Sequence, residues 1–444
     1  MAFPIIFSFL DTAIYIILIG IITFFLSRTK YSGFERKFLI WGFLLRAFAT
    51  PLYLLYHKYV QKTGDIFQYY SDSTYLSNIF FKSPSLYFKM LFSEITPTKF
   101  PDIDMYKQMF LFEKDEAMIC KFGSFIGIFL NSSFLNISLI FSLFGLLGCW
   151  KIYTTYKKLY PDYAKQFGYA ILFVPSVLFF GTSLTKDSLC LGGLGLLFSA
   201  LFQIFVFKEK IIKNVFILFF CFIIFLNVKI YILMSILPAL LFSFIIKFII
   251  GIKNRIIKYL IFPLIIYTFY LLVVFSSTYL GDIAEKYAFE NLTKTLVVNY
   301  NYLSKETFAG SSYDLGTIEP TITSILGHFL AAVNVSLFRP FFWEIKNSSM
   351  FVSSVESTFT ILISLYVILK KGIFNIFKQI FKNYTILFSF TFCIIFSFAI
   401  GISSGNFGTL IRYKIPMIPF YFSALVILYN SKKTLPFNKS TPIG

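Results

Sequence analysis

Apolar runs close to the length of a membrane-spanning helix alternate with polar segments along nearly the whole chain. A helix needs about 20 apolar residues to cross the hydrocarbon core of a bilayer. By this measure we expect eleven spans. They are residues 5–27, 37–57, 122–149, 165–183, 188–207, 212–228, 231–250, 257–279, 351–369, 384–402 and 414–431. The pattern predicts an all-α protein, a polytopic bundle of transmembrane helices that forms a single domain over residues 1–444.

Two polar segments are too long to be simple turns between spans. Residues 58–121 and 280–350 are predicted to be long outer loops, and loops of this length are uncommon unless they carry function. The second contains an apolar piece at 322–343. A further span there would move the basic segment 370–382 to the other side of the membrane, so we expect 322–343 to be re-entrant or interfacial.

The charges fall into two groups that differ in sign. Six segments between or after the spans hold 22 of the 40 Lys and Arg residues but only 3 of the 21 Asp and Glu residues. They are residues 28–37, 151–165, 208–213, 247–258, 370–382 and 432–439. Basic loops face the cytoplasm. We therefore expect an outer N-terminus and a cytoplasmic C-terminus, and the heavy use of Phe, Ile, Lys and Asn indicates an AT-rich bacterial genome.

Several functional classes are disfavoured by composition. The mean hydropathy is +0.76, and the basic residues lie in short loops, so topology explains the charge better than nucleic acid does. The five cysteines lack CxxC spacing and there are only two histidines, so no zinc or disulfide site is predicted. No phosphate-binding glycine motif occurs. We predict no cofactor and no metal site, with a divalent ion left open.

The first motif that could carry chemistry is Gly64–Asp72, with the sequence GDIFQYYSD. Asp65 is the candidate general base for an acceptor hydroxyl. Tyr69, Tyr70 and Asp72 are candidate contacts for a sugar or an acceptor. The alternative is that Asp65 only caps the helix that follows.

Two further motifs place cations at the outer ends of spans. Lys186 and Asp187 begin a span, where free N–H groups favour anions, so Lys186 is a candidate for binding phosphate and Asp187 for contacting the acceptor. Lys229 interrupts an apolar stretch and is a second phosphate candidate. The alternatives are a helix cap with a snorkelling lysine and a tight outer turn.

The last two motifs, RPFFWE and NFGTLIRYKIP, each supply an arginine. Arg339 and Arg412 could each bind a phosphate through two parallel N–H donors. A pair of Arg339 with Glu344, and an interfacial belt around Arg412, are the alternatives. Their neighbours include one phosphate candidate, Lys414, and three residues that could contact a sugar or acceptor: Trp343, Glu344 and Tyr413.

Four of these stretches, GDIFQYY, PSVLFFGTSLTKDS, RPFFWE and RYKIP, together resemble bacterial membrane proteins of surface-polysaccharide assembly. These are polytopic glycosyltransferases of the GT-C type and O-antigen or capsule polymerases. The resemblance implies a GT-C-like fold, Asp65 as the base, and Arg339 and Arg412 as ligands of the donor pyrophosphate. It also implies a polyprenyl-phosphate-linked sugar as the partner.

The sequence thus predicts a glycosyltransferase or polysaccharide polymerase at the outer face of the inner membrane. Two other classes stay open. A flippase or transporter of lipid-linked glycans would need ionisable groups within several spans, where Asp11, Arg46 and Lys229 are the main examples. A non-catalytic scaffold of an assembly complex would also fit long charged outer loops. The oligomeric state, the donor sugar and the linkage are left open.

Overall fold

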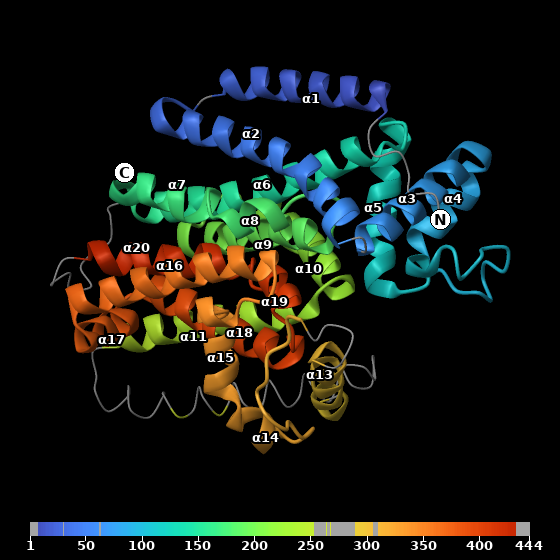
Figure 1. Cartoon of the computed structure of the whole chain (residues 1–444). Coiled ribbons are helices and arrows are strands. Elements are labelled where there is room, and N and C mark those ends of the chain that lie inside the picture. The colour runs from blue at the N-terminus through green and yellow to red at the C-terminus, as the bar shows by residue number, and fades with distance from the viewer. Residues whose placement is uncertain are drawn as a thin grey trace. The chain divides into compact units, whose positions relative to one another are not determined.

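The structure, a computed structural model of the chain, describes residues 8–29, 31–61, 64–252, 263, 267, 289–304 and 310–431. Across these residues the protein is all-helical and contains no strand (Figure 1). The chain divides into two compact units, Met1–Leu233 and Met234–Gly444, and each is described by itself. The predicted all-α class is confirmed.

The first unit is a bundle built around two buried helices. Its α-helices are α1 (Phe9–Ser27), α2 (Gly33–Leu55), α3 (Asp65–Lys82), α4 (Pro84–Phe92), α5 (Lys114–Phe129), α6 (Phe134–Leu159), α7 (Ala164–Leu172), α8 (Pro175–Phe180), α9 (Lys186–Phe202) and α10 (Ile211–Asn227). Single turns of other helix types are η1 (Tyr56–Gln61), η2 (Met109–Leu111), η3 (Pro161–Tyr163) and η4 (Gln203–Phe207). Helix α9 is apolar and buried on all sides, and α6 packs along it.

Small residues bring α6 and α9 unusually close together. A Cβ atom added to Gly195 would lie 2.0 Å from the carbonyl oxygen of Gly148, and one added to Gly148 would lie 2.2 Å from the carbonyl oxygen of Leu191. The two backbones are therefore in direct contact, as in helix pairs of membrane proteins that pack through glycine. This contact fixes the start of α9, where Lys186 and Asp187 lie.

One end of the first unit collects its basic loops. Lys157, near the end of α6, bonds Glu35 in the first turn of α2 at 2.5 Å, and Lys158 bonds Glu209, just after η4, at 2.7 Å. The start of α2 and the ends of α6 and of the α9–η4 helix thus share one end. The residues that begin α9 lie at the other end, about 33 Å away for a helix of 22 residues.

The second unit contains the C-terminal helices and a short strap. Helix α11 (Ile230–Gly251) enters it from the first unit, and its other elements are α13 (Phe289–Ser304), α14 (Ile322–Gly327), α15 (Phe329–Phe338), η7 (Phe342–Glu344), α16 (Ser348–Lys371), α17 (Ile373–Lys382), α18 (Tyr384–Ser404), α19 (Phe407–Tyr413) and α20 (Ile418–Asn430). Residues 310–316 cross the break between α18 and α19. There Ser312 pairs with Asn406, and Tyr313 donates from its hydroxyl to the Gly401 carbonyl at 2.8 Å.

Seven helices in the described part of the chain are long and apolar enough to cross a membrane. They are Phe9–Ser27, Gly33–Gln61, Phe134–Leu159, Lys186–Phe207, Ile230–Gly251, Met350–Lys371 and Tyr384–Ser404. The bent pair α19 and α20 makes an eighth if it counts as one span. The chain is therefore a helical membrane protein, whereas the expected eleven spans are not confirmed.

Two predicted spans are broken into separate helices. The segment 122–149 falls on the end of α5 and the start of α6, because Asn131 and Ser132 adopt positive φ angles and end the first helix. The segment 165–183 falls on α7 and α8, because Pro175 cannot continue the helix before it. Mean hydropathy could not reveal either break, since both lie inside apolar sequence.

The segments expected as loops are also partly helical. Residues 58–121 contain α3, α4 and the start of α5 rather than an extended loop. The expected re-entrant segment 322–343 forms the short helices α14 and α15. Within 280–350, α13 is described as well. The expected span 257–279 lies almost entirely outside the described residues.

Candidate functional site

A polar cluster occupies the end of the first unit that lies away from its basic loops, and α3 contributes its first part. Asp65 is in the first turn of α3 and is exposed. Gly64 precedes it at a φ of +149°, and a Cβ there would lie 2.5 Å from Nδ1 of His57. Glycine thus lets the chain turn tightly against His57, and Asp65 is held at the rim of the cluster.

Asp72, two turns further along α3, is fully buried. One carboxylate oxygen accepts from the Gln68 amide at 2.7 Å, and the other accepts from the Phe110 backbone N–H at 3.1 Å. Burial raises the pKa of Asp72 to about 7, although both hydrogen bonds oppose the shift. Asp72 was expected to contact a sugar, but its oxygens face the interior of the unit.

The centre of the cluster is an ion-pair network between α3, α5 and α9. Lys186 bonds Glu116 at 2.5 Å and Asp115 at 2.9 Å, and Tyr69 donates from its hydroxyl to Glu116. Burial raises the pKa of Glu116, against the opposing charge of Lys186. Burial and the Glu116 charge also hold the Tyr69 pKa well above its usual value, and the charge of Asp65 adds to this effect. Asp65, Tyr69, Glu116 and Lys186 are therefore electrostatically coupled.

A second ion pair lies beside the first. Lys229, between α10 and α11, bonds Asp187 at 2.6 Å, with side chains only 7% and 2% exposed. The buried thiol of Cys120 lies close enough to Asp72, Glu116 and Lys186 for the charge of each to act on it. Asp72 and the ion-pair network therefore share one buried region around Cys120. The structure thus brings three of the sequence motifs together at one end of the first unit.

The cluster carries more negative than positive charge. Three carboxylates, those of Asp115, Glu116 and Asp187, pair with the two lysines, and Asp65 and Asp72 add two more to the cluster. A phosphate could reach Lys186 or Lys229 only by displacing a carboxylate, which makes these two residues weaker phosphate candidates than the sequence indicated. Among the described residues, no group of three or more His, Cys, Asp or Glu side chains has the geometry to hold a metal ion.

The second unit holds a separate site around Arg339. Its guanidinium bonds Glu344 through Nε at 2.9 Å and through Nη2, and it lies 5.3 Å from the centre of the Phe407 ring. Burial would raise the pKa of Glu344, but the bonds from Arg339 and the Phe341 amide outweigh burial and lower it. The pairing of Arg339 with Glu344, the alternative considered from sequence, is confirmed. The contact with Phe407 joins the fourth motif to the fifth.

Ser357 links Arg339 to the lysine of the fifth motif. The Ser357 hydroxyl donates to the Arg339 carbonyl at 3.0 Å and lies 3.4 Å from Nζ of Lys414, which is buried. Arg412 and Tyr413 are half-buried at the end of α19.

Two aromatic side chains expected to contact a sugar differ in their surroundings. Trp343 is 81% exposed and stacks on Phe341, with ring centres 4.7 Å apart. Tyr70 stacks on Phe134 at 4.4 Å inside the first unit. Trp343 is therefore available to a ligand, whereas one face of Tyr70 is covered.

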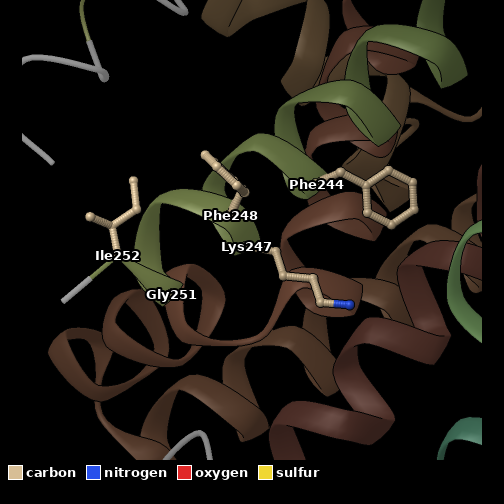
Figure 2. A pocket seen from close by; sticks show the side chains of 5 residues that line it. All are labelled: Phe244, Lys247, Phe248, Gly251 and Ile252. Carbon is tan, nitrogen blue, oxygen red and sulfur yellow. The ribbon is translucent and has the colours of Figure 1, made fainter. Parts of the chain in front are cut away.

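A hollow of about 410 Å³ lies elsewhere, at the end of α11. Figure 2 shows its lining of Phe244, Lys247, Phe248, Gly251 and Ile252, all from one stretch of chain. It contains a single charged group, and catalytic pockets are expected to combine several converging polar groups. We therefore do not place the candidate active site there.

Some residues of these sites escaped the sequence reasoning. Asp115 and Glu116 were read as part of a loop, although a charged run before an apolar segment is typical of a helix N-terminus. Ser357 and Cys120 carry no sequence signal of their own. Asp65 belongs to the first unit, whereas Arg339 and Arg412 belong to the second. The candidate base and the candidate phosphate ligands therefore lie in different units.

No protein-family model matches the chain, and neither a curated protein nor a solved structure matches it significantly.

Proposed function

We propose that the protein is an integral membrane glycosyltransferase or polysaccharide polymerase at the outer face of the bacterial inner membrane. It would use polyprenyl-(pyro)phosphate-linked sugars to build a cell-surface glycan. The observation that carries this proposal is the polar cluster of the first unit. Its exposed carboxylate, Asp65, is coupled through Tyr69 to the Glu116–Lys186 pair, at the end opposite the basic loops.

In the proposed reaction, Asp65 accepts the proton of an acceptor hydroxyl. The hydroxyl oxygen then attacks the anomeric carbon of the donor sugar, and the lipid (pyro)phosphate leaves with the electron pair of the broken C–O bond. Within the second unit, Arg339 and Arg412 are the candidates for binding the lipid (pyro)phosphate. Arg339 would exchange Glu344 for the phosphate, since two phosphate oxygens can accept from the same pair of parallel N–H donors as a carboxylate.

The test is Asp65→Asn, with Asp102→Asn as the matched control. Both residues are exposed carboxylates of the 58–121 segment, but only Asp65 adjoins the cluster. We expect Asp65→Asn to lower glycan synthesis by about 10²–10⁴-fold, since that is the usual contribution of a general base. Glycan product and membrane protein level are measured together. Normal product from Asp65→Asn would reject Asp65 as the base.

A lipid-linked glycan flippase is a second candidate because of one buried cation. Arg46 lies within α2, is fully buried, and donates to the carbonyls of Val177 and Gly181 at and after the short helix α8. Ionisable groups beside broken helices are typical of transporter sites. Purified protein in liposomes distinguishes the two functions: a transferase forms a new glycosidic bond, whereas a flippase moves the lipid-linked sugar without changing it.

A further inference from the structure

Helix α17 is placed at a membrane surface by the two helices that flank it. It runs from Ile373 to Lys382, and only Gly372 and Asn383 separate it from α16 and α18. Both neighbours are long and apolar enough to cross a membrane, whereas ten residues reach only about 15 Å. A helix too short to cross, placed between two spans, therefore joins them on one side of the bilayer and lies along that surface.

One side of α17 is fixed on the protein. The Gln379 side chain accepts from the hydroxyl of Ser431, the residue after α20, and Ile376 is buried. Lys371, at the end of α16, donates to the Ser431 carbonyl at 2.7 Å. These contacts fix the rotation of α17 about its axis, so they also determine which residues face outward.

The outward side carries a stripe of phenylalanines. Phe374, Phe377 and Phe381 are spaced by three and four residues and are 88%, 57% and 49% exposed. Residues at this spacing lie on one helix face. Three large aromatic side chains side by side are costly to leave in water, so this face is expected to be covered.

The charge of the residues around the phenylalanine face indicates what covers that face. Lys378 and Lys382 are four residues apart, so they lie on one side of the helix, next to the phenylalanines. The chain contains no Asp or Glu after Glu356. Lys247 of α11 lies 4.4 Å from the Tyr384 ring at the start of α18, which adds a cation beside the hollow of Figure 2. A two-fold contact between two copies of the chain through this face would bring two basic patches together, because such a contact buries the same patch of both copies.

We propose that α17 lies in the headgroup layer of the membrane and binds anionic phospholipid. Phe374, Phe377 and Phe381 enter the outer part of the acyl chains, while Lys378 and Lys382 contact lipid phosphates. An apolar face beside a basic row is the pattern of helices that lie in the plane of a charged membrane surface. The proposal requires only that the chain spans a membrane, so it is independent of any glycosyltransferase activity.

The depth of Phe377 tests the first half of the proposal. A nitroxide label is attached to Phe377→Cys in the full chain, reconstituted in nanodiscs of phosphatidylglycerol and phosphatidylcholine. The five native cysteines are buried and can stay, with the labelled native chain as a blank. Power saturation with oxygen and with a soluble nickel chelate should place the label about 5–10 Å below the phosphates. Phe359→Cys, midway along α16, should lie deeper, and Lys107→Cys should lie in water.

Nickel accessibility equal to that of Lys107→Cys would overturn the proposal. So would a label reached by neither reagent, which would mean that protein covers the face. Variants are compared only when they elute as the native chain does, and Phe374→Cys replaces Phe377→Cys if the latter misfolds.

The lipid preference tests the second half. Dissociation constants for phosphatidylglycerol and phosphatidylcholine are measured by native mass spectrometry. Replacing both Lys378 and Lys382 with Gln should reduce the preference for the anionic lipid by up to roughly 30-fold, since each surface lysine contributes about fivefold. The control is the pair Lys107→Gln and Lys114→Gln, two exposed lysines of the first unit. An unchanged ratio would overturn the anionic preference.

Discussion

Asp72 is the group whose charge should most strongly couple the stability of the protein to pH. Its carboxyl is fully buried, and its pKa is about 7, compared with an ordinary value of 3.8. We consider the change Asp72→Asn, which removes the ionisation and keeps the shape of the side chain. The amide oxygen of Asn can still accept from either Gln68 or the Phe110 N–H, as a protonated carboxyl does.

The direction follows from the raised pKa. A carboxyl that holds its proton more tightly in the folded state contributes a stabilisation that is fully present below pH 3.8. This contribution is lost as the pH rises through about 7. Between pH 5 and pH 8 the loss amounts to about 2.6 kcal/mol for these two pKa values. The native chain should therefore lose about 2–3 kcal/mol relative to Asp72→Asn over this interval, and little more above it.

The free energy of unfolding of both proteins is measured by titration with dodecyl sulfate in mixed micelles at several pH values. Glu116 also has a raised pKa and shifts stability in the same direction, but it is present in both proteins, so the difference between them reports Asp72. Asn should come out about level with the native residue near pH 3, where the carboxyl is protonated in both states, or up to about 1 kcal/mol lower for a weakened hydrogen bond. It should already be about 1.7 kcal/mol ahead of the native residue at pH 5, apart from that hydrogen-bond difference. Parallel curves from pH 5 to pH 8 would refute the reasoning.

Two further predictions concern the cations. Lys186→Gln removes the cation that bonds Glu116 and Asp115, so it should lower the free energy of unfolding by about 2–3 kcal/mol. Adding Glu116→Gln should recover part of the loss, and strict additivity of the two changes would contradict the pairing. Arg412→Lys should lose most glycan product, as Arg412→Ala should, if Arg412 binds phosphate through two parallel donors. Full activity of Arg412→Lys at equal protein level would instead favour a role in membrane anchoring.

The positions of most long helices could be predicted from the sequence, because a long apolar run leaves the backbone no other way to satisfy its hydrogen bonds in a membrane. The predicted spans 188–207, 231–250 and 384–402 each lie within or almost within one helix. The errors come from local backbone conformation. The breaks at Asn131 and at Pro175 lie within apolar sequence, where hydropathy averages over them.

The candidate residues were easier to predict than their partners. Lys186 stood out as a cation at the start of a span, but its partner Glu116 lies 70 residues earlier and was assigned to a loop. Asp187 was likewise expected at the outer end of a span. Its bond to Lys229 was not, because that contact depends on how α9 packs against the turn before α11. One sequence contains no signal for such long-range pairs, because either residue would look the same with a different partner.

The cluster of the first unit is hard to explain by stability. Buried ion pairs contribute little net stability, since the loss of hydration offsets their attraction, and apolar residues often serve as well. Asp72 is further from balance, because its carboxyl is held by hydrogen bonds from Gln68 and Phe110 and its burial costs more as the pH approaches neutrality. A chain that is 57% apolar could fill this volume with hydrocarbon. Groups with strongly shifted pKa values gather where protons move, and this is the physical reason to look for the chemistry of the first unit around Tyr69, Asp72 and Glu116 rather than among its lysines.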